Sequence, residues 1–66
     1  MKKTKKDIVE EMIKSNEEEI MRMEIVRDFN VTSDHDEAKV QVDAANKAIK
    51  KCEIQLTFLR EHLKIV

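Results

Sequence analysis

Cys52 and the two histidines, His35 and His62, are the residues best suited to nucleophilic or metal chemistry. A reactive thiol needs solvent exposure and an electropositive neighbour, and no histidine stands at helical spacing from Cys52 to activate it. The other interpretation of Cys52 is a small buried core residue, and this is what we predict. His62 is isolated and is expected at the solvated surface.

The acidic run D-H-D-E at residues 34–37 is a second chemical candidate, because its side chains could bind a metal ion. Consecutive residues at a helix start point in different directions, and no H-x-x-x-H or C-x-x-C spacing supports a metal site. Helix capping is the alternative that we favour, with Thr32, Ser33 or Asp34 as the cap. Without a glycine for a phosphate loop or paired carboxylates, we expect no cofactor, no metal and no enzymatic activity.

The lysines suggest nucleic-acid binding as an alternative function. They form one cluster at the start of the chain and another in its second half: Lys2, Lys3, Lys5, Lys6, Lys47, Lys50 and Lys51. Sequence-tolerant binding of nucleic acid uses aromatic side chains for stacking, and none lies among these lysines. The formal net charge is −1, which gives no general attraction for phosphate. We therefore do not expect nucleic acid as a partner, and interpret the first cluster as a solubilising terminus.

Composition predicts the elements that must position these residues. The chain has 66 residues without glycine or proline, and hydrophobic and charged residues each make up 41%. Hairpin turns and multi-stranded sheets need Gly or Pro at fixed places. Glu, Lys, Ile, Leu and Met without helix breakers are instead typical of long helices. A chain of this length forms a single domain and buries only ~60% of its unfolded surface.

The second half of the chain contains E-I-Q-L-T-F-L, which alternates apolar and polar residues as a strand would. The wider spacing excludes a strand, because apolar residues recur at intervals of four and three, as in a heptad seam: Ala38, Val42, Ala45, Ile49, Cys52, Leu56, Leu59, Leu63 and Val66. A second seam on nearly the opposite side is apolar at its ends and basic in its middle: Val40, Ala44, Lys47, Lys51, Ile54, Phe58, Glu61 and Ile65. We predict one helix with two apolar faces.

The first half of the chain carries a looser seam: Val9, Ile13, Asn16, Ile20, Met23 and Arg27. Met21 and Ile25 fall outside it and form a small second patch. The predicted fold is all-α, an antiparallel two-helix hairpin that is coiled-coil-like. Its helices are expected at about residues 4–29 and 34–64, joined by a turn at about residues 30–33.

Pairing outward from this turn sets the expected register between the helices. Val9 falls near Leu56 and Asn16 near Ile49, whereas Leu59 and Leu63 would face Lys6 and Lys2. Monomers rarely expose the apolar patch that would result. We therefore predict a homo-oligomer, with a dimer that forms a four-helix bundle favoured. The residues expected at this oligomer or partner interface are Ile54, Phe58, Leu59, Leu63, Ile65, Val66, Val40, Met21 and Ile25.

Asn16 interrupts the apolar seam of the first helix. A buried polar residue there would specify the register or the oligomeric state. An asparagine at the edge of a wide apolar face would instead bind water. The sequence leaves both interpretations open.

The expected function is that of a small non-enzymatic protein–protein interaction module, a regulator or adaptor with an unidentified protein partner. The start M-K-K-T-K-K is followed by no hydrophobic core, so no export signal is expected, and no stretch reaches the ~20 apolar residues of a membrane span. A single cysteine fits a reducing, cytoplasmic setting.

The layout resembles the plasmid copy-control protein Rop in architecture alone, and without a shared motif this resemblance implies nothing about RNA binding.

Overall fold

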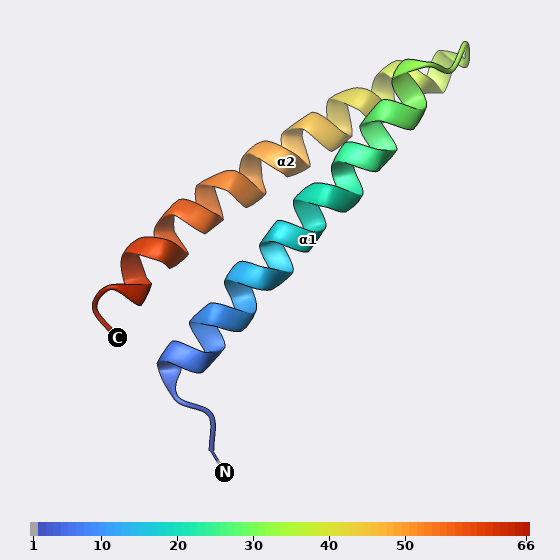
Figure 1. Cartoon of the computed structure of the whole chain (residues 1–66). Helices are drawn as coiled ribbons and strands as arrows, with labels where there is room; N and C mark the ends of the chain where they lie inside the picture. Colours follow the sequence, from blue (N-terminus) through green and yellow to red (C-terminus); the bar gives the residue numbers. More distant parts are fainter. Residues whose placement is uncertain (1) are drawn as a thin grey trace.

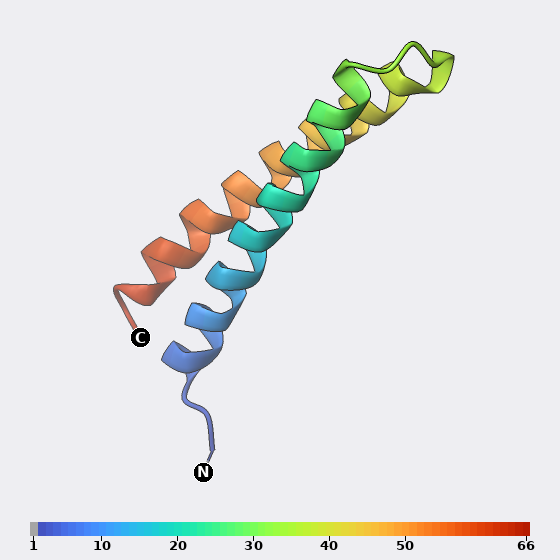
Figure 2. The same cartoon turned by 45° about the vertical axis from the view of Figure 1, so that its right-hand side comes forward.

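Two long helices lie side by side and run in opposite directions (Figures 1 and 2). The structure, a computed structural model, describes residues 2–66, with α1 spanning Lys5–Val31 and α2 spanning Asp36–Leu63. No strand occurs in this described part of the chain, so the predicted all-α hairpin is confirmed. Its dimensions are 50 × 22 × 12 Å and its radius of gyration is 15.2 Å, against about 11 Å for a compact chain of this length. The hairpin is therefore a rod.

The core is a single seam between the two helices. Its most buried residues are Val9, Ala38, Ala45, Ile49, Cys52 and Leu56. Five of these six belong to the seam predicted for the second half of the chain, so the helical interpretation of that segment is confirmed. The buried position of Cys52 also confirms it as a core residue.

Small residues form the part of the core near the turn, and larger ones form the part toward the termini. Ala38 and Ala45 are the most buried side chains near the turn, whereas Ile49 and Leu56 are buried further along α2. The distance between packed helices depends on the side chains at their contact. In agreement with this, the two ribbons lie closest near the turn and diverge toward the termini (Figure 1).

The register between the helices differs from the predicted one by about two to three helical turns. Glu17 Oε2 lies 3.6 Å from Arg60 Nη2 across the hairpin, and Asn16 lines a hollow with Leu59 instead of lying level with Ile49. The cause is the linker, which runs on past the end of α1 before α2 turns back (Figures 1 and 2). The larger apolar residues near the end of α2 thereby find partners on α1.

α1 ends and α2 begins two residues later than predicted. Thr32 Oγ1 and Ser33 Oγ both donate to the carbonyl oxygen of Phe29, at 3.0 and 3.1 Å. These hydroxyls therefore satisfy a carbonyl that the end of α1 leaves without a helical partner. With no glycine or proline to stop it, α1 continues to Val31.

The start of α2 has no side-chain cap. Its N-cap residue is His35, whose side chain makes no capping hydrogen bond. The prediction that Thr32, Ser33 or Asp34 caps this helix is therefore wrong, because the first two hydroxyls are turned toward α1. The acidic residues of the first turn are placed as predicted, where the positive end of the helix dipole favours them.

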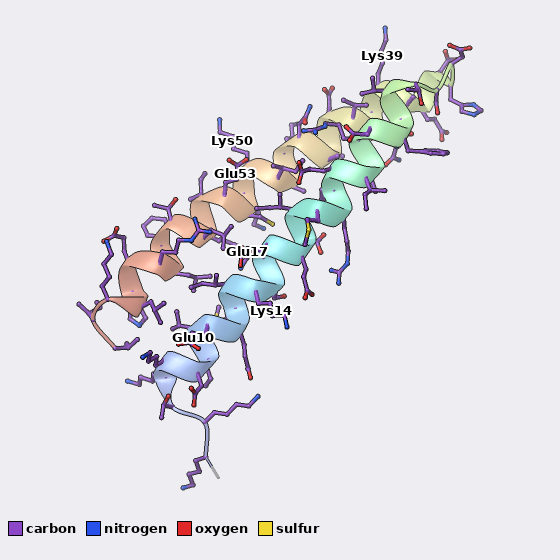
Figure 3. All side chains as sticks on the ribbon, viewed as in Figure 1. Glu10, Lys14, Glu17, Lys39, Lys50 and Glu53 are labelled. Atoms are coloured by element: carbon purple, nitrogen blue, oxygen red, sulfur yellow. The ribbon has the colours of Figure 1, made fainter. Side chains whose placement is uncertain are left out.

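Charged side chains cover the outside of the hairpin. Lys39 and Lys50 project from the side of α2 that faces away from α1, while Glu10 and Lys14 follow one another along α1 (Figure 3). Apart from the bridge between Glu17 and Arg60 and the pair of Lys3 and Glu11, the ion pairs of the described residues join side chains at most four residues apart, such as Arg22 and Glu19 at 3.0 Å. Exposed pairs of this kind contribute ~0.3–0.5 kcal/mol each, so they solubilise the rod more than they hold it together.

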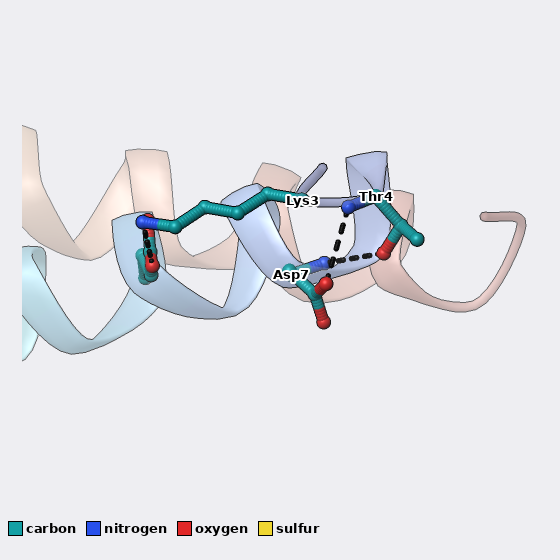
Figure 4. Close-up of polar contacts among 4 residues, drawn as sticks. Lys3, Thr4 and Asp7 are labelled. Atoms are coloured by element: carbon teal, nitrogen blue, oxygen red, sulfur yellow. Dashed lines mark hydrogen bonds and ion pairs between the residues drawn. The ribbon is translucent and has the colours of Figure 1, made fainter. Parts of the chain in front are cut away.

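A capping box fixes the start of α1 (Figure 4). The backbone N–H of Asp7 donates to Thr4 Oγ1, and the backbone N–H of Thr4 donates to Asp7 Oδ2, each at 3.1 Å. Hydrogen bonding from the backbone of Thr4, and next from its side chain, holds the pKa of the Asp7 carboxyl below its ordinary value. The T-x-x-D spacing carries this signal in the sequence, although the predicted helix range of about residues 4–29 places Thr4 inside the helix.

Candidate interaction surface

The face of α2 nearly opposite to the interhelical seam carries large apolar side chains that stay mostly exposed in the hairpin. Ile54 is 51% exposed, Phe58 71% and Ile65 79%, and Val40 nearer the turn is also exposed. These residues belong to the second seam of the helix, and the seam toward α1 is nearly opposite to it. The hairpin cannot bury both faces of α2 at once.

A shallow hollow follows this outer face. It is lined by Lys47, Lys50, Lys51, Ile54, Gln55 and Phe58. Ile54 and Phe58 form an apolar floor, and the aliphatic stems of the lysines extend it while their ammonium groups reach into solvent. The site therefore presents an apolar strip with a basic margin.

Two of the predicted interface residues are placed differently from the expectation. Leu59 and Leu63 are half-buried within their own hairpin, and Val66 is 40% exposed. The expectation that all three stay largely exposed is wrong for the two leucines, because the shifted register brings α1 beside them. Leu59, for example, lines a hollow together with Met12 and Asn16.

A second apolar patch lies on α1. Met21 and Ile25 are exposed as predicted, and Phe29, 72% exposed, continues them at the same spacing of four residues. Phe29 is not among the residues predicted for this patch, although the i, i+4, i+8 spacing places it there. Met21 lines a hollow with Leu56 and Arg60, on the flank of the hairpin away from Phe58.

Asn16 is half-buried at the edge of the interhelical seam. Its side-chain Nδ2 donates to the carbonyl oxygen of Met12 at 2.9 Å. The hydrogen bond is made within α1, so Asn16 needs no polar partner on α2. Asn16 also lines the hollow that contains Phe58.

The two lysine clusters are not brought together. The first lies at the open end of the hairpin, where Lys3 Nζ donates to Glu11 Oε1 at 2.6 Å (Figure 4); this hydrogen bond and the Glu11 charge raise the pKa of Lys3. The second cluster, which includes Lys51, lies roughly 20–30 Å away along the rod at 1.5 Å per residue. The lysines therefore form no continuous basic stripe.

The remaining chemical candidates stay apart from one another. No group of three or more His, Cys, Asp or Glu side chains in residues 2–66 is arranged to hold a metal ion. His35 and His62 are exposed at opposite ends of α2, one at its N-cap and the other in its last turn. Over the same residues, neither helix has a segment long and apolar enough to cross a bilayer.

The fold and the exposed faces define the chain as a helical hairpin with unsatisfied apolar surface. Comparison with known proteins adds no family, because no protein-family model, curated protein or solved structure matches the chain significantly. Function must therefore be argued from the surface itself.

Proposed function

We propose that this chain is a small non-enzymatic protein–protein interaction module, a regulator or adaptor, that works as a homo-oligomer. A dimer in which two hairpins combine four helices is the favoured assembly, and a reducing, cytoplasmic setting suits its one unpaired thiol. The outer face of α2 binds a second copy. The patch of Met21 and Ile25 on α1 is left for a different protein partner.

The observation that supports this proposal is the surplus of surface in the single hairpin. Its accessible area is 5600 Å², whereas a folded monomer of 7.8 kDa is expected to expose about 4400 Å². The surplus of about 1200 Å² exceeds the roughly 800 Å² that each partner contributes to a standard interface. Large apolar side chains such as Phe58 and Ile65 make up part of this surplus. One hairpin therefore exposes enough surplus area to form one interface of standard size.

Sedimentation equilibrium and circular dichroism over about a hundredfold dilution of the full chain test the proposal. A dimer that buries the outer face of α2 should lose mass and helical signal together as the chain is diluted, since the free energy of folding then includes that of association. A chain that stays at the mass of one hairpin and stays helical at every concentration would contradict the proposal.

The partner patch is tested separately. Bait chains of wild type and Ile25→Glu, compared by pull-down from the native cell lysate, should differ in the proteins they retain while both remain dimeric. If wild type and Ile25→Glu retained the same proteins, this would contradict the proposal that Met21 and Ile25 bind a partner.

A further inference from the structure

The outer face of α2 has a charge pattern as well as an apolar strip. Going along the helix at intervals of four and three, its residues are Lys47, Lys51, Ile54, Phe58, Glu61 and Ile65. All six are exposed in the single hairpin. Two lysines precede the apolar pair and one glutamate follows it. The face is therefore basic on one side of the apolar pair and acidic on the other.

We infer that this face binds the same face of a second copy, with the two α2 helices antiparallel and a two-fold axis at the level of Leu56. The inference rests on the proposed self-association and specifies its geometry. Ile54 and Phe58 each lie two residues from this level. Ile54 of each copy therefore packs against Phe58 of the second copy, and the contact is made twice, as a two-fold interface requires.

The same axis matches the charges. Lys51 and Glu61 each lie five residues from the level of Leu56, so Lys51 of each copy meets Glu61 of the second copy. Lys47 and Ile65 each lie nine residues away, where the aliphatic stem of the lysine covers the isoleucine. One register thus joins the apolar pair and the opposite charges without further assumptions.

Other arrangements of the two faces bring the wrong groups together. A parallel pair places Lys51 against Lys51 and Glu61 against Glu61, and like charges repel. An antiparallel pair shifted by one heptad toward the start of α2 places Lys47 on Phe58 and Lys51 on Ile54 of the second copy, so it loses both the contact between Ile54 and Phe58 and the contact between Lys51 and Glu61. A shift of one heptad the other way places Phe58 on Glu61. Covering a charge with an apolar side chain is costly unless the charge is paired, so the register centred at Leu56 is preferred.

Two features of the single hairpin oppose this register to a small degree. Glu61 Oε1 lies 3.3 Å from Lys64 Nζ within α2, and Lys51 of the second copy must share or replace this exposed contact. At the rim, Lys50 and Lys64 lie six and eight residues from the axis level on opposite sides, so they approach each other between copies. The second feature makes its own prediction, because a negative charge at position 50 would turn this repulsion into attraction.

Charge reversal tests the register. Lys51→Glu and Glu61→Lys should each raise the dimer dissociation constant about tenfold or more, since each change replaces two attractive contacts per dimer by two repulsive ones. The double variant Lys51→Glu with Glu61→Lys restores both contacts and should return to within about threefold of wild type. Lys39→Glu is the matched control: it makes the same charge change on the same helix, but it lies 17 residues from the level of Leu56 and outside the contacts that this register pairs. Lys50→Glu should tighten the dimer.

Sedimentation equilibrium at low salt measures the dissociation constants, with circular dichroism on every variant. Single variants that also unfold leave the test intact, because the double variant has the wild-type composition and must recover both helicity and association. Dimers that persist in all variants, or a double variant weaker than both singles, would overturn this register while self-association stands. A wild-type chain that is monomeric throughout would overturn the proposed self-association itself.

Discussion

Phe58→Glu is the substitution that separates a free-standing hairpin from an associated one. Phe58 is 71% exposed in the single chain, and a fully exposed phenylalanine presents ~200 Å². The second copy would therefore cover up to ~140 Å², worth ~3.5 kcal/mol per chain at 25 cal/mol per Å². Two copies of Phe58 then contribute ~7 kcal/mol to the dimer, or about five orders of magnitude in the dissociation constant.

Phe29→Glu is the control for this experiment. Phe29 is 72% exposed, so the two substitutions remove the same side chain from positions that are equally accessible in one hairpin. Phe29 lies on α1 outside the proposed self-association face. Its substitution should change stability by no more than ~0.5 kcal/mol, as is usual at exposed sites.

Sedimentation equilibrium and circular dichroism across about a hundredfold dilution provide the readout. Phe58→Glu should be monomeric where wild type is dimeric, and it should lose helical signal, because the core of a chain of this size supplies at most ~3–5 kcal/mol and we expect association to supply the stability that one hairpin lacks. Phe29→Glu should follow wild type. Equal behaviour of the two variants, with helicity and mass unchanged, would refute burial of Phe58 between chains.

Three further predictions concern other parts of the rod. Asn16→Leu should raise the melting temperature while broadening the distribution of oligomers in sedimentation velocity, if the amide specifies register; a variant that is less stable yet cleanly dimeric would argue against that role. Thr4→Ala should lower the free energy of unfolding in urea by ~1 kcal/mol. Because the folded pKa of Asp7 is lowered, the capping box stabilises wild type fully above the ordinary carboxyl pKa of 3.8. This stabilisation is lost as the pH falls through the lowered value, and Thr4→Ala should lose less stability over that range. Duplex DNA or RNA should show no micromolar binding at physiological salt, and a gel shift that weakens as salt is added would contradict this.

The helix faces were predictable from the sequence because they depend only on spacing. Residues such as Ala45, Ile49 and Leu56 recur at heptad intervals, and any straight helix places them on one side. The same argument gave the outer face with Ile54 and Phe58, since a helix that packs against one neighbour leaves its opposite side uncovered.

The relative position of the two helices was not predictable in this way. It depends on the path of the linker, where Thr32 and Ser33 bind the carbonyl of Phe29 and the chain continues past the end of α1. A heptad pattern repeats every seven residues. Shifting one helix along the other by one heptad therefore still sets apolar positions against apolar positions, and it changes only which residues contact each other. For this reason the expectation for Leu59 and Leu63 was wrong although the seam was right.

The change from alanine near the turn to larger residues near the termini gives the rod a gradient of local stability. Close packing and a covalent link hold the turn end, while the diverging end should open first, so amide hydrogen exchange should be slowest around Ala45 and fastest near Leu63 in an isolated hairpin. The inferred contact between copies is centred at Leu56, toward the diverging end. A second copy would therefore stabilise the diverging end, and amide hydrogen exchange near Leu63 would slow as the protein concentration rises. Amide exchange at the residues that fray in one chain would therefore show whether two chains are associated.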